Sequence, residues 1–178
     1  LVQGIGHVGD SLVGHLTKEG AKVYINDISE ERLKAVAAKY KAEVVSPDTM
    51  FDLDIDVYAP CALGATVNDD TLAKLKCKII CGAANNQLAE EQKHGELVGK
   101  KGILYAPDYV VNAGGIINVY YELEGYNRER AMAHAEKIYA TTSNIFQLAK
   151  KEGIPTYMAA NRLGEQRIEA IAKINAIY

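Results

Sequence analysis

Cysteine is scarce in this sequence, which contains only Cys61, Cys77 and Cys81. They form no Cys-x-x-Cys pair and have no histidine at the spacing of metal ligands, so we expect no metal site. An odd set of isolated cysteines also argues against a disulfide scaffold and favours a reducing cytoplasm. We interpret all three as small buried hydrophobic side chains, because unpaired cysteine is among the most often buried residue types.

Long apolar runs are also absent, since charged residues interrupt each one well before the roughly 20 residues of a membrane-spanning helix. The first residues have neither the basic nor the apolar region of a signal peptide. No stretch concentrates lysine and arginine, and the net charge is −3. We therefore expect a soluble, cytoplasmic protein that binds neither membranes nor nucleic acids.

The 178 residues are 48% hydrophobic and 24% charged, which is typical of a globular domain. Strand-like segments alternate with helix-like segments through the first two thirds of the chain, which predicts an α/β fold with a mostly parallel, doubly wound sheet. The predicted strands are 21–28, 43–45, 55–59, 78–81 and 103–106, and the predicted helices are 8–19, 30–40, 70–75 and 88–98.

Only helices are predicted after Gly114-Gly115, at 116–124, 128–151 and 159–174. We therefore assign residues 1–126 to the sheet-containing domain and residues 127–178 to helices that complete it. The first strand has only Leu1-Val2-Gln3 before the first glycine, whereas strands usually have roughly five or six residues. We expect this strand to be truncated.

The segment Gly4-Ile5-Gly6-His7-Val8-Gly9 matches the G-x-G-x-x-G motif between a strand and a helix. The first glycine allows a tight turn, the second lets a pyrophosphate approach the backbone, and the third lets helix and strand pack closely. Free N–H groups at the helix start then face the phosphates. The motif predicts dinucleotide binding of the Rossmann type.

Asp27 strengthens this prediction because it ends the second predicted strand, where a carboxylate can accept hydrogen bonds from the adenine ribose. Its charge would repel the 2′-phosphate of NADP, and the following Ile28-Ser29 supplies no arginine. We therefore expect NAD as cofactor. Enzymes that use S-adenosylmethionine also pair a glycine-rich loop with an acid here, so a methyltransferase-like activity is an alternative.

Three further loops follow the later predicted strands, at the edge where open α/β sheets bind ligands. They are rich in small residues and amides, and comprise residues 59–62, 82–86 and 107–115. Taken alone, Asn85 and Asn112 are typical turn residues.

Several blocks in order resemble the coenzyme-binding half of the Glu/Leu/Phe/Val dehydrogenase family, and among its members the leucine dehydrogenases most. Beside the glycine motif, they are 58–65 (YAPCALGA), 84–88 (ANNQL), 105–109 (YAPDY), 112–115 (NAGG) and 125–130 (GYNRER). The family oxidatively deaminates L-amino acids to 2-oxo acids and ammonia with NAD. The resemblance implies that activity here, with leucine as substrate and phenylalanine or valine as alternatives. A non-catalytic NAD-binding module is an alternative of another class.

The resemblance also assigns roles to residues. Asp27 is expected at the adenine ribose, the backbone of Cys61-Ala62 along the nucleotide, and Asn85 at the nicotinamide ribose. Asn112 is expected between the nicotinamide and the amino acid. The candidate cofactor-binding residues are Gly4, Ile5, Gly6, His7, Val8, Gly9, Asp27, Ile28, Cys61, Ala62, Asn85 and Asn112.

In this family the catalytic lysine and aspartate lie in a separate N-terminal domain, so no residue of this chain is assigned a catalytic role. An exposed loop acid (Asp108), a loop aromatic (Tyr109) and a helix-face histidine (His134) are interpreted as structural.

The resemblance places Ala135 and Ile138, together with Asn112, in the substrate pocket, although apolar residues three apart on a helix are commonly core. The helices after about residue 127 are expected to pack toward the N-terminal catalytic domain. We expect a homo-oligomer.

Overall fold

The computed structural model describes residues 1–175, which form two compact units. The first unit is Leu1–Asn112, and the second begins at Ala113. The boundary expected between residues 126 and 127 lies inside the second unit. The proposal that residues 127–178 complete the domain and face a catalytic domain stays a prediction.

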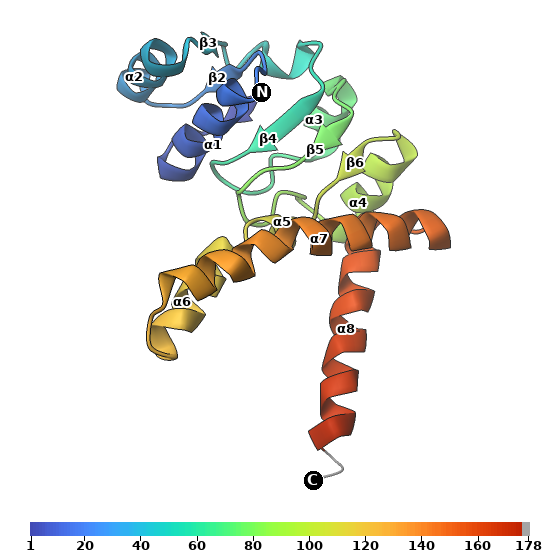
Figure 1. Ribbon diagram of the computed structural model, residues 1–178. Helices are drawn as coiled ribbons and strands as arrows, with labels where there is room; N and C mark the ends of the chain where they lie inside the picture. Colours follow the sequence, from blue (N-terminus) through green and yellow to red (C-terminus); the bar gives the residue numbers. More distant parts are fainter. Residues whose placement is uncertain (176–178) are drawn as a thin grey trace. The chain divides into compact units, whose positions relative to one another are not determined.

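The first unit is built on a six-stranded parallel sheet in the order β3-β2-β1-β4-β5-β6 (Figure 1). Val2 of the central strand pairs with Ile25 on one side and with Ala59 on the other. The strands are β1 (Val2–Gln3), β2 (Tyr24–Asn26), β3 (Glu43–Val44), β4 (Val57–Pro60), β5 (Ile79–Ile80) and β6 (Leu104–Tyr105). The predicted doubly wound α/β fold is confirmed, with strands shorter than the apolar segments that contain them.

Helices connect successive strands, because parallel strands require a crossover. In Figure 1, α1 and α2 lie beside β1–β3, and α3 and α4 beside β4–β6. The helices of this unit are α1 (His7–Lys18), α2 (Glu30–Tyr40), the 3-10 helix η1 (Met50–Asp52), α3 (Asp69–Lys74), α4 (Glu91–Lys100) and α5 (Asp108–Val111).

Both faces of the sheet are buried. Successive residues of a strand point to opposite faces, so Tyr58 joins one hydrophobic cluster and Ala59 joins the other. The cluster with Tyr58 includes Leu72 and Val98, from α3 and α4. The second cluster includes Val13 of α1. Buried faces on both sides hold the strand ends, and the loops that follow them, in fixed positions.

The N-terminus of α2 follows the local signals in the sequence. Ser29 caps the helix, with its Oγ accepting a hydrogen bond from the backbone N–H of Arg32 at 3.3 Å. Glu30 and Glu31 occupy the first turn, where acids interact favourably with the helix dipole. The observed bounds of α2 equal the predicted ones. This cap fixes the chain just after Asp27.

The segment 107–115 differs from its prediction as a loop. It contains the short helix α5 (Asp108–Val111) and the start of α6 (Gly114–Leu123). The N–H of Asn112 bonds to the carbonyl of Asp108 at 2.9 Å and ends α5. A helix of four residues has too few turns to show helical periodicity, so the sequence pattern did not reveal it.

The second unit contains α6, α7 (Arg128–Glu152) and α8 (Thr156–Asn175). The Asn127 side chain caps α7 by accepting the N–H of Arg130 at 2.9 Å. Gly153, with φ of +65°, ends the helix in the left-handed conformation that favours glycine. Ile117 and Tyr121 of α6 pack on Ala131 of α7. Among the described residues, no helix is long and apolar enough to cross a membrane.

Candidate functional site

The glycine loop after β1 needs glycine for steric reasons at two positions. Gly4 has φ of +90°, and a Cβ there would lie 2.5 Å from the Cβ of Ala62. A Cβ on Gly9 would lie 2.0 Å from the carbonyl oxygen of Gly4. The loop is therefore packed against itself and against the segment after β4, as the turn and close-packing roles of these glycines require.

Gly6 is different, because a Cβ built there meets no atom within 4 Å. It is the N-cap of α1, and no side chain caps this helix. The protein's own packing therefore does not explain a glycine at this position. Open space beside an uncapped helix start is what a phosphate group requires.

Asp27 connects the end of β2 to the glycine loop. Its Oδ2 accepts the backbone N–H of Ile5 and its Oδ1 that of Ser29, both at 2.8 Å. The side chain is only 5% exposed. Burial raises the pKa of the carboxyl, but the N–H groups of Ile5 and Ser29 and the nearby Arg32 outweigh it and hold the pKa below its usual range. Asp27 is therefore a fixed, ionised acceptor.

Arg32 covers this carboxylate, and sequence reasoning missed it. Its Nη1 lies 3.4 Å from Oδ2 and 3.5 Å from Oδ1 of Asp27, while its side chain is 55% exposed. A residue in the first turn of a helix lies close to the strand end before that helix, and this spacing could have revealed it. Arg32 also borders a cavity of about 490 Å³ whose lining includes Ile5, Gly6 and His7 of the glycine loop.

Three apolar side chains are exposed in the segments after β1, β2 and β4, which are neighbouring strands. Val8 is exposed at the start of α1, Ile28 is fully exposed beside Asp27, and the exposed Leu63 follows Ala62. Val8, Ile28 and Leu63 offer contacts to a ligand with apolar rings.

The prediction that all three cysteines are buried holds only for Cys77. Cys61 and Cys81 are half-buried, and burial raises the pKa of both thiols.

The structure brings Asn85 and Asn112 together although they are 27 residues apart. The Nδ2 of Asn112 donates to Oδ1 of Asn85 at 2.5 Å and to the carbonyl of Ala83 at 3.3 Å. Asn85 is exposed and Asn112 is half-buried. The pair joins the loop after β5 to the end of α5, so both amides lie at the carboxyl edge of the sheet.

Gln87 and Asp108 hold the loop after β5 in place through hydrogen bonds, and sequence reasoning did not identify this role. Gln87 is buried and donates from Nε2 to the carbonyls of Gly82 and Ala84 at 2.6 and 3.0 Å. Asp108 accepts the backbone N–H of Gln87 at 2.8 Å. Asp108 was expected to be an exposed loop acid, and this was wrong: it is buried because it begins α5 beneath the loop.

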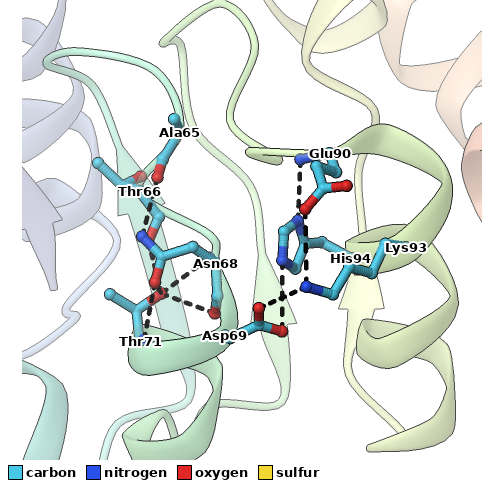
Figure 2. Close-up of polar contacts among 8 residues, drawn as sticks. All are labelled: Ala65, Thr66, Asn68, Asp69, Thr71, Glu90, Lys93 and His94. Atoms are coloured by element: carbon cyan, nitrogen blue, oxygen red, sulfur yellow. Dashed lines mark hydrogen bonds and ion pairs between the residues drawn. The ribbon is translucent and has the colours of Figure 1, made fainter.

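A second polar group connects α3 to α4 (Figure 2). His94 is 2% exposed, and its Nδ1 accepts the N–H of Glu90 at 2.8 Å. Its Nε2 lies 3.6 Å from Asp69, which also pairs with Lys93 at 2.5 Å. Asn68 caps α3 through a reciprocal pair with Thr71. These contacts hold the segment between β4 and α3 in place. None of them involves a candidate cofactor-binding residue.

The remaining sequence candidates lie on α5 and in the second unit. His134 stacks edge-on against Tyr121 within the second unit, with ring centroids 5.9 Å apart. Ala135 and Ile138 are partly buried against the α6–α7 core. Tyr109 lies on α5 rather than in a loop. The ring contact of His134 supports the structural role expected for that side chain.

A cavity of about 320 Å³ lies near Leu1, Tyr24 and Val57, at the amino ends of the strands. In parallel sheets this end rarely binds ligands. In the part of the chain that the structure describes, no group of three histidine, cysteine or acidic residues could hold a metal ion.

Comparisons with known proteins agree on one family. A family model described as Glutamate/Leucine/Phenylalanine/Valine dehydrogenase matches residues 24–175. The leucine dehydrogenase of Thermoactinomyces intermedius is 51% identical over 177 residues, 99% of this chain and 48% of the relative. The phenylalanine dehydrogenase of Caldalkalibacillus thermarum is 43% identical over 182 residues, covering 99% and 49%.

The crystal structure of L-tryptophan dehydrogenase from Nostoc punctiforme superposes on the chain with a TM-score of 0.94 and 45% identity, covering 97% of this chain and 52% of that one. The chain thus spans about half the length of the curated relatives it matches.

Proposed function

Because the chain belongs to the Glutamate/Leucine/Phenylalanine/Valine dehydrogenase family, we propose that it is the NAD-binding half of an L-amino-acid dehydrogenase. The observation that carries this proposal is the glycine loop. Gly4 and Gly9 are needed for packing, whereas Gly6 leaves open space at an uncapped helix start. A Cβ on Gly6 would fill only that space, which supports a pyrophosphate as its occupant.

The remaining candidate residues supply the other parts of a dinucleotide site. The fixed carboxylate of Asp27 is the acceptor for the adenine-ribose hydroxyls, and the exposed Ile28 offers an apolar contact to the adenine. The backbone at Cys61-Ala62 adjoins the glycine loop and forms the side of the site along the nucleotide. Asn85 and Asn112 hold the nicotinamide end. When bound, NAD supplies the acceptor for the substrate's hydride.

We propose L-leucine as the substrate and its 2-oxo acid and ammonia as the products. Identity to a leucine dehydrogenase supports this choice, and a phenylalanine dehydrogenase at 43% identity keeps the alternatives of the same family open. Asn112, Ala135 and Ile138 are the proposed pocket residues in this chain. None of its residues is assigned the catalytic proton transfers, which belong to the N-terminal half of such an enzyme.

The proposed setting is a cytoplasmic homo-oligomer. Ile116, Val119 and Leu123 of α6 and Ile168 of α8 are exposed apolar residues in the second unit. Exposed apolar residues on one unit support contacts with further protein surface, from a catalytic half or from another subunit.

Isothermal titration of the chain with NADH tests the cofactor. We expect micromolar binding, at least tenfold weaker binding to Gly6→Ala, and unchanged binding to Gly99→Ala. Gly99 is the matched control, because a Cβ there also meets no atom within 4 Å but lies in α4. Binding of S-adenosylmethionine without binding of NADH would overturn the proposal.

The substrate class is tested in an enzyme that combines this chain with a catalytic half. NADH formation is followed with L-leucine, L-valine, L-phenylalanine and L-tryptophan. The highest kcat/KM is expected for L-leucine. A higher value for an aromatic amino acid would contradict that assignment and leave NAD binding in place.

A further inference from the structure

Asp27 and its ion-pair partner Arg32 differ in how firmly their side chains are held. The two backbone hydrogen bonds to Asp27 are short, at 2.8 Å, and hold its carboxylate in place. The contacts from Arg32 are long, at 3.4 and 3.5 Å, and come only from Nη1. Asp27 is thus fixed in place, whereas the Arg32 side chain is held near it only by long, weak contacts.

The contacts around Asp27, including the one from Arg32, limit the access of a ribose to its carboxylate. The Asp27 side chain is 5% exposed, so a ribose hydroxyl reaches its oxygens only where a present contact gives way. The backbone donors belong to the glycine loop and to the cap of α2, which cannot move without disturbing the fold. The half-exposed Arg32 side chain is the contact that can leave, since exposed ion pairs contribute little.

Arg32 has the chemistry of a phosphate ligand. A guanidinium stays charged and offers five N–H donors in a geometry that matches phosphate oxygens. In this structure it lies beside the carboxylate assigned to the adenine ribose and borders the cavity at Gly6 and His7. A phosphate on the ribose 2′-oxygen would therefore be within reach of this side chain.

We propose that Arg32 is a latent ligand for the 2′-phosphate of NADP. Asp27 holds Arg32 in an ion pair, so that cofactor choice depends on this pair. This inference rests on the proposed NAD-binding function. With NAD, the ribose displaces Arg32 from Asp27. With NADP, Asp27 repels the 2′-phosphate and at the same time keeps Arg32, the ligand for that phosphate, in the ion pair. Neutralising Asp27 removes the repulsion and releases Arg32 in one step.

A double-mutant titration tests the proposal by binding alone. NADH and NADPH are titrated into wild type, Asp27→Ser, Arg32→Gln and the double variant, with circular dichroism as the check of folding. Asp27→Ser is expected to bind NADPH at least tenfold more tightly than wild type, and adding Arg32→Gln is expected to remove most of that gain. Equal NADPH affinity of Asp27→Ser and the double variant would overturn the role of Arg32.

A second measurement keeps Asp27 intact in case its serine variant fails to fold. The affinities for 2′,5′-ADP and 5′-AMP are compared in wild type and Arg32→Gln. Arg32→Gln leaves the charge of Asp27 without its ion-pair partner, so the variant is expected to bind 2′,5′-ADP at least fivefold more weakly relative to 5′-AMP. Lys100→Gln, an exposed charge on α4, controls for net charge. An unchanged ratio in Arg32→Gln would overturn the proposal, whereas absence of NADH binding to wild type would overturn the proposed function as well.

Discussion

The carboxylate of Asp27 accepts the backbone N–H of Ile5 at 2.8 Å and so joins the end of β2 to the loop after β1. The two residues are 22 positions apart, yet the order β2-β1 places them side by side. The proposed ribose acceptor thus also holds the proposed phosphate loop, and changes at Asp27 affect both folding and binding.

Gly9→Ala is expected to lower the stability of the fold, whereas Gly6→Ala is expected to weaken NADH binding. A Cβ at Gly9 would lie 2.0 Å from the carbonyl oxygen of Gly4, so Gly9→Ala should lower the free energy of unfolding by about 1–3 kcal/mol or more. Gly6→Ala should leave stability nearly unchanged and weaken NADH binding. Urea unfolding and calorimetric titration check the pair. A strongly destabilised Gly6→Ala variant would show that protein packing, and not a ligand, explains this glycine.

The acid stability of the chain should depend on Asp27. Its pKa is lowered from 3.8 in the folded state, so its stabilising contribution is fully present above the unfolded value. The contribution is lost as the pH falls below about 3.8 through the lower folded pKa. Asp27→Asn should therefore flatten the decline of unfolding free energy in that range. Parallel curves for the variant and wild type would contradict the assignment.

The prediction of α2 from sequence succeeded because its signals are local. The cap Ser29, the acids of the first turn and the apolar spacing all lie within the helix or next to it. The Rossmann-type, doubly wound parallel sheet also followed from the glycine motif and the alternation of strands and helices. These features need no knowledge of distant residues.

The missed features depend on contacts between distant parts of the chain. Asp108 supports Gln87 from 21 positions away, and its burial follows from the loop that packs over it. Helix α5 is too short for periodicity. The pairing of Arg32 with Asp27 was not predicted because only the two residues directly after Asp27 were considered as phosphate ligands.

The Asn85–Asn112 pair predicts a selective effect on the nicotinamide end. Asn112→Ala removes the donor to Asn85 and Ala83, which should cost about 0.5–1.5 kcal/mol of stability. It should weaken NADH binding severalfold and leave 5′-AMP binding unchanged, because 5′-AMP lacks the nicotinamide half. An equal loss for both ligands would mean that Asn112 supports the site only through folding.

His94 is expected to be a structural residue that nucleotide binding does not require. It is buried and accepts the N–H of Glu90, so His94→Ala should lower the unfolding free energy by about 2–4 kcal/mol. Lys93→Ala, which removes an exposed partner of Asp69, should leave the urea midpoint nearly unchanged. A folded His94→Ala variant that no longer binds NADH would place this cluster in the binding site.

Hydrogen–deuterium exchange with and without NADH tests the central claim most directly, because it reports where the nucleotide binds. We predict slower exchange in peptides that cover residues 4–9 and 24–29, with smaller protection near residues 83–86. Protection confined to α7 and α8, or binding of NADH with unchanged exchange at residues 4–9, would contradict a dinucleotide site at the glycine loop.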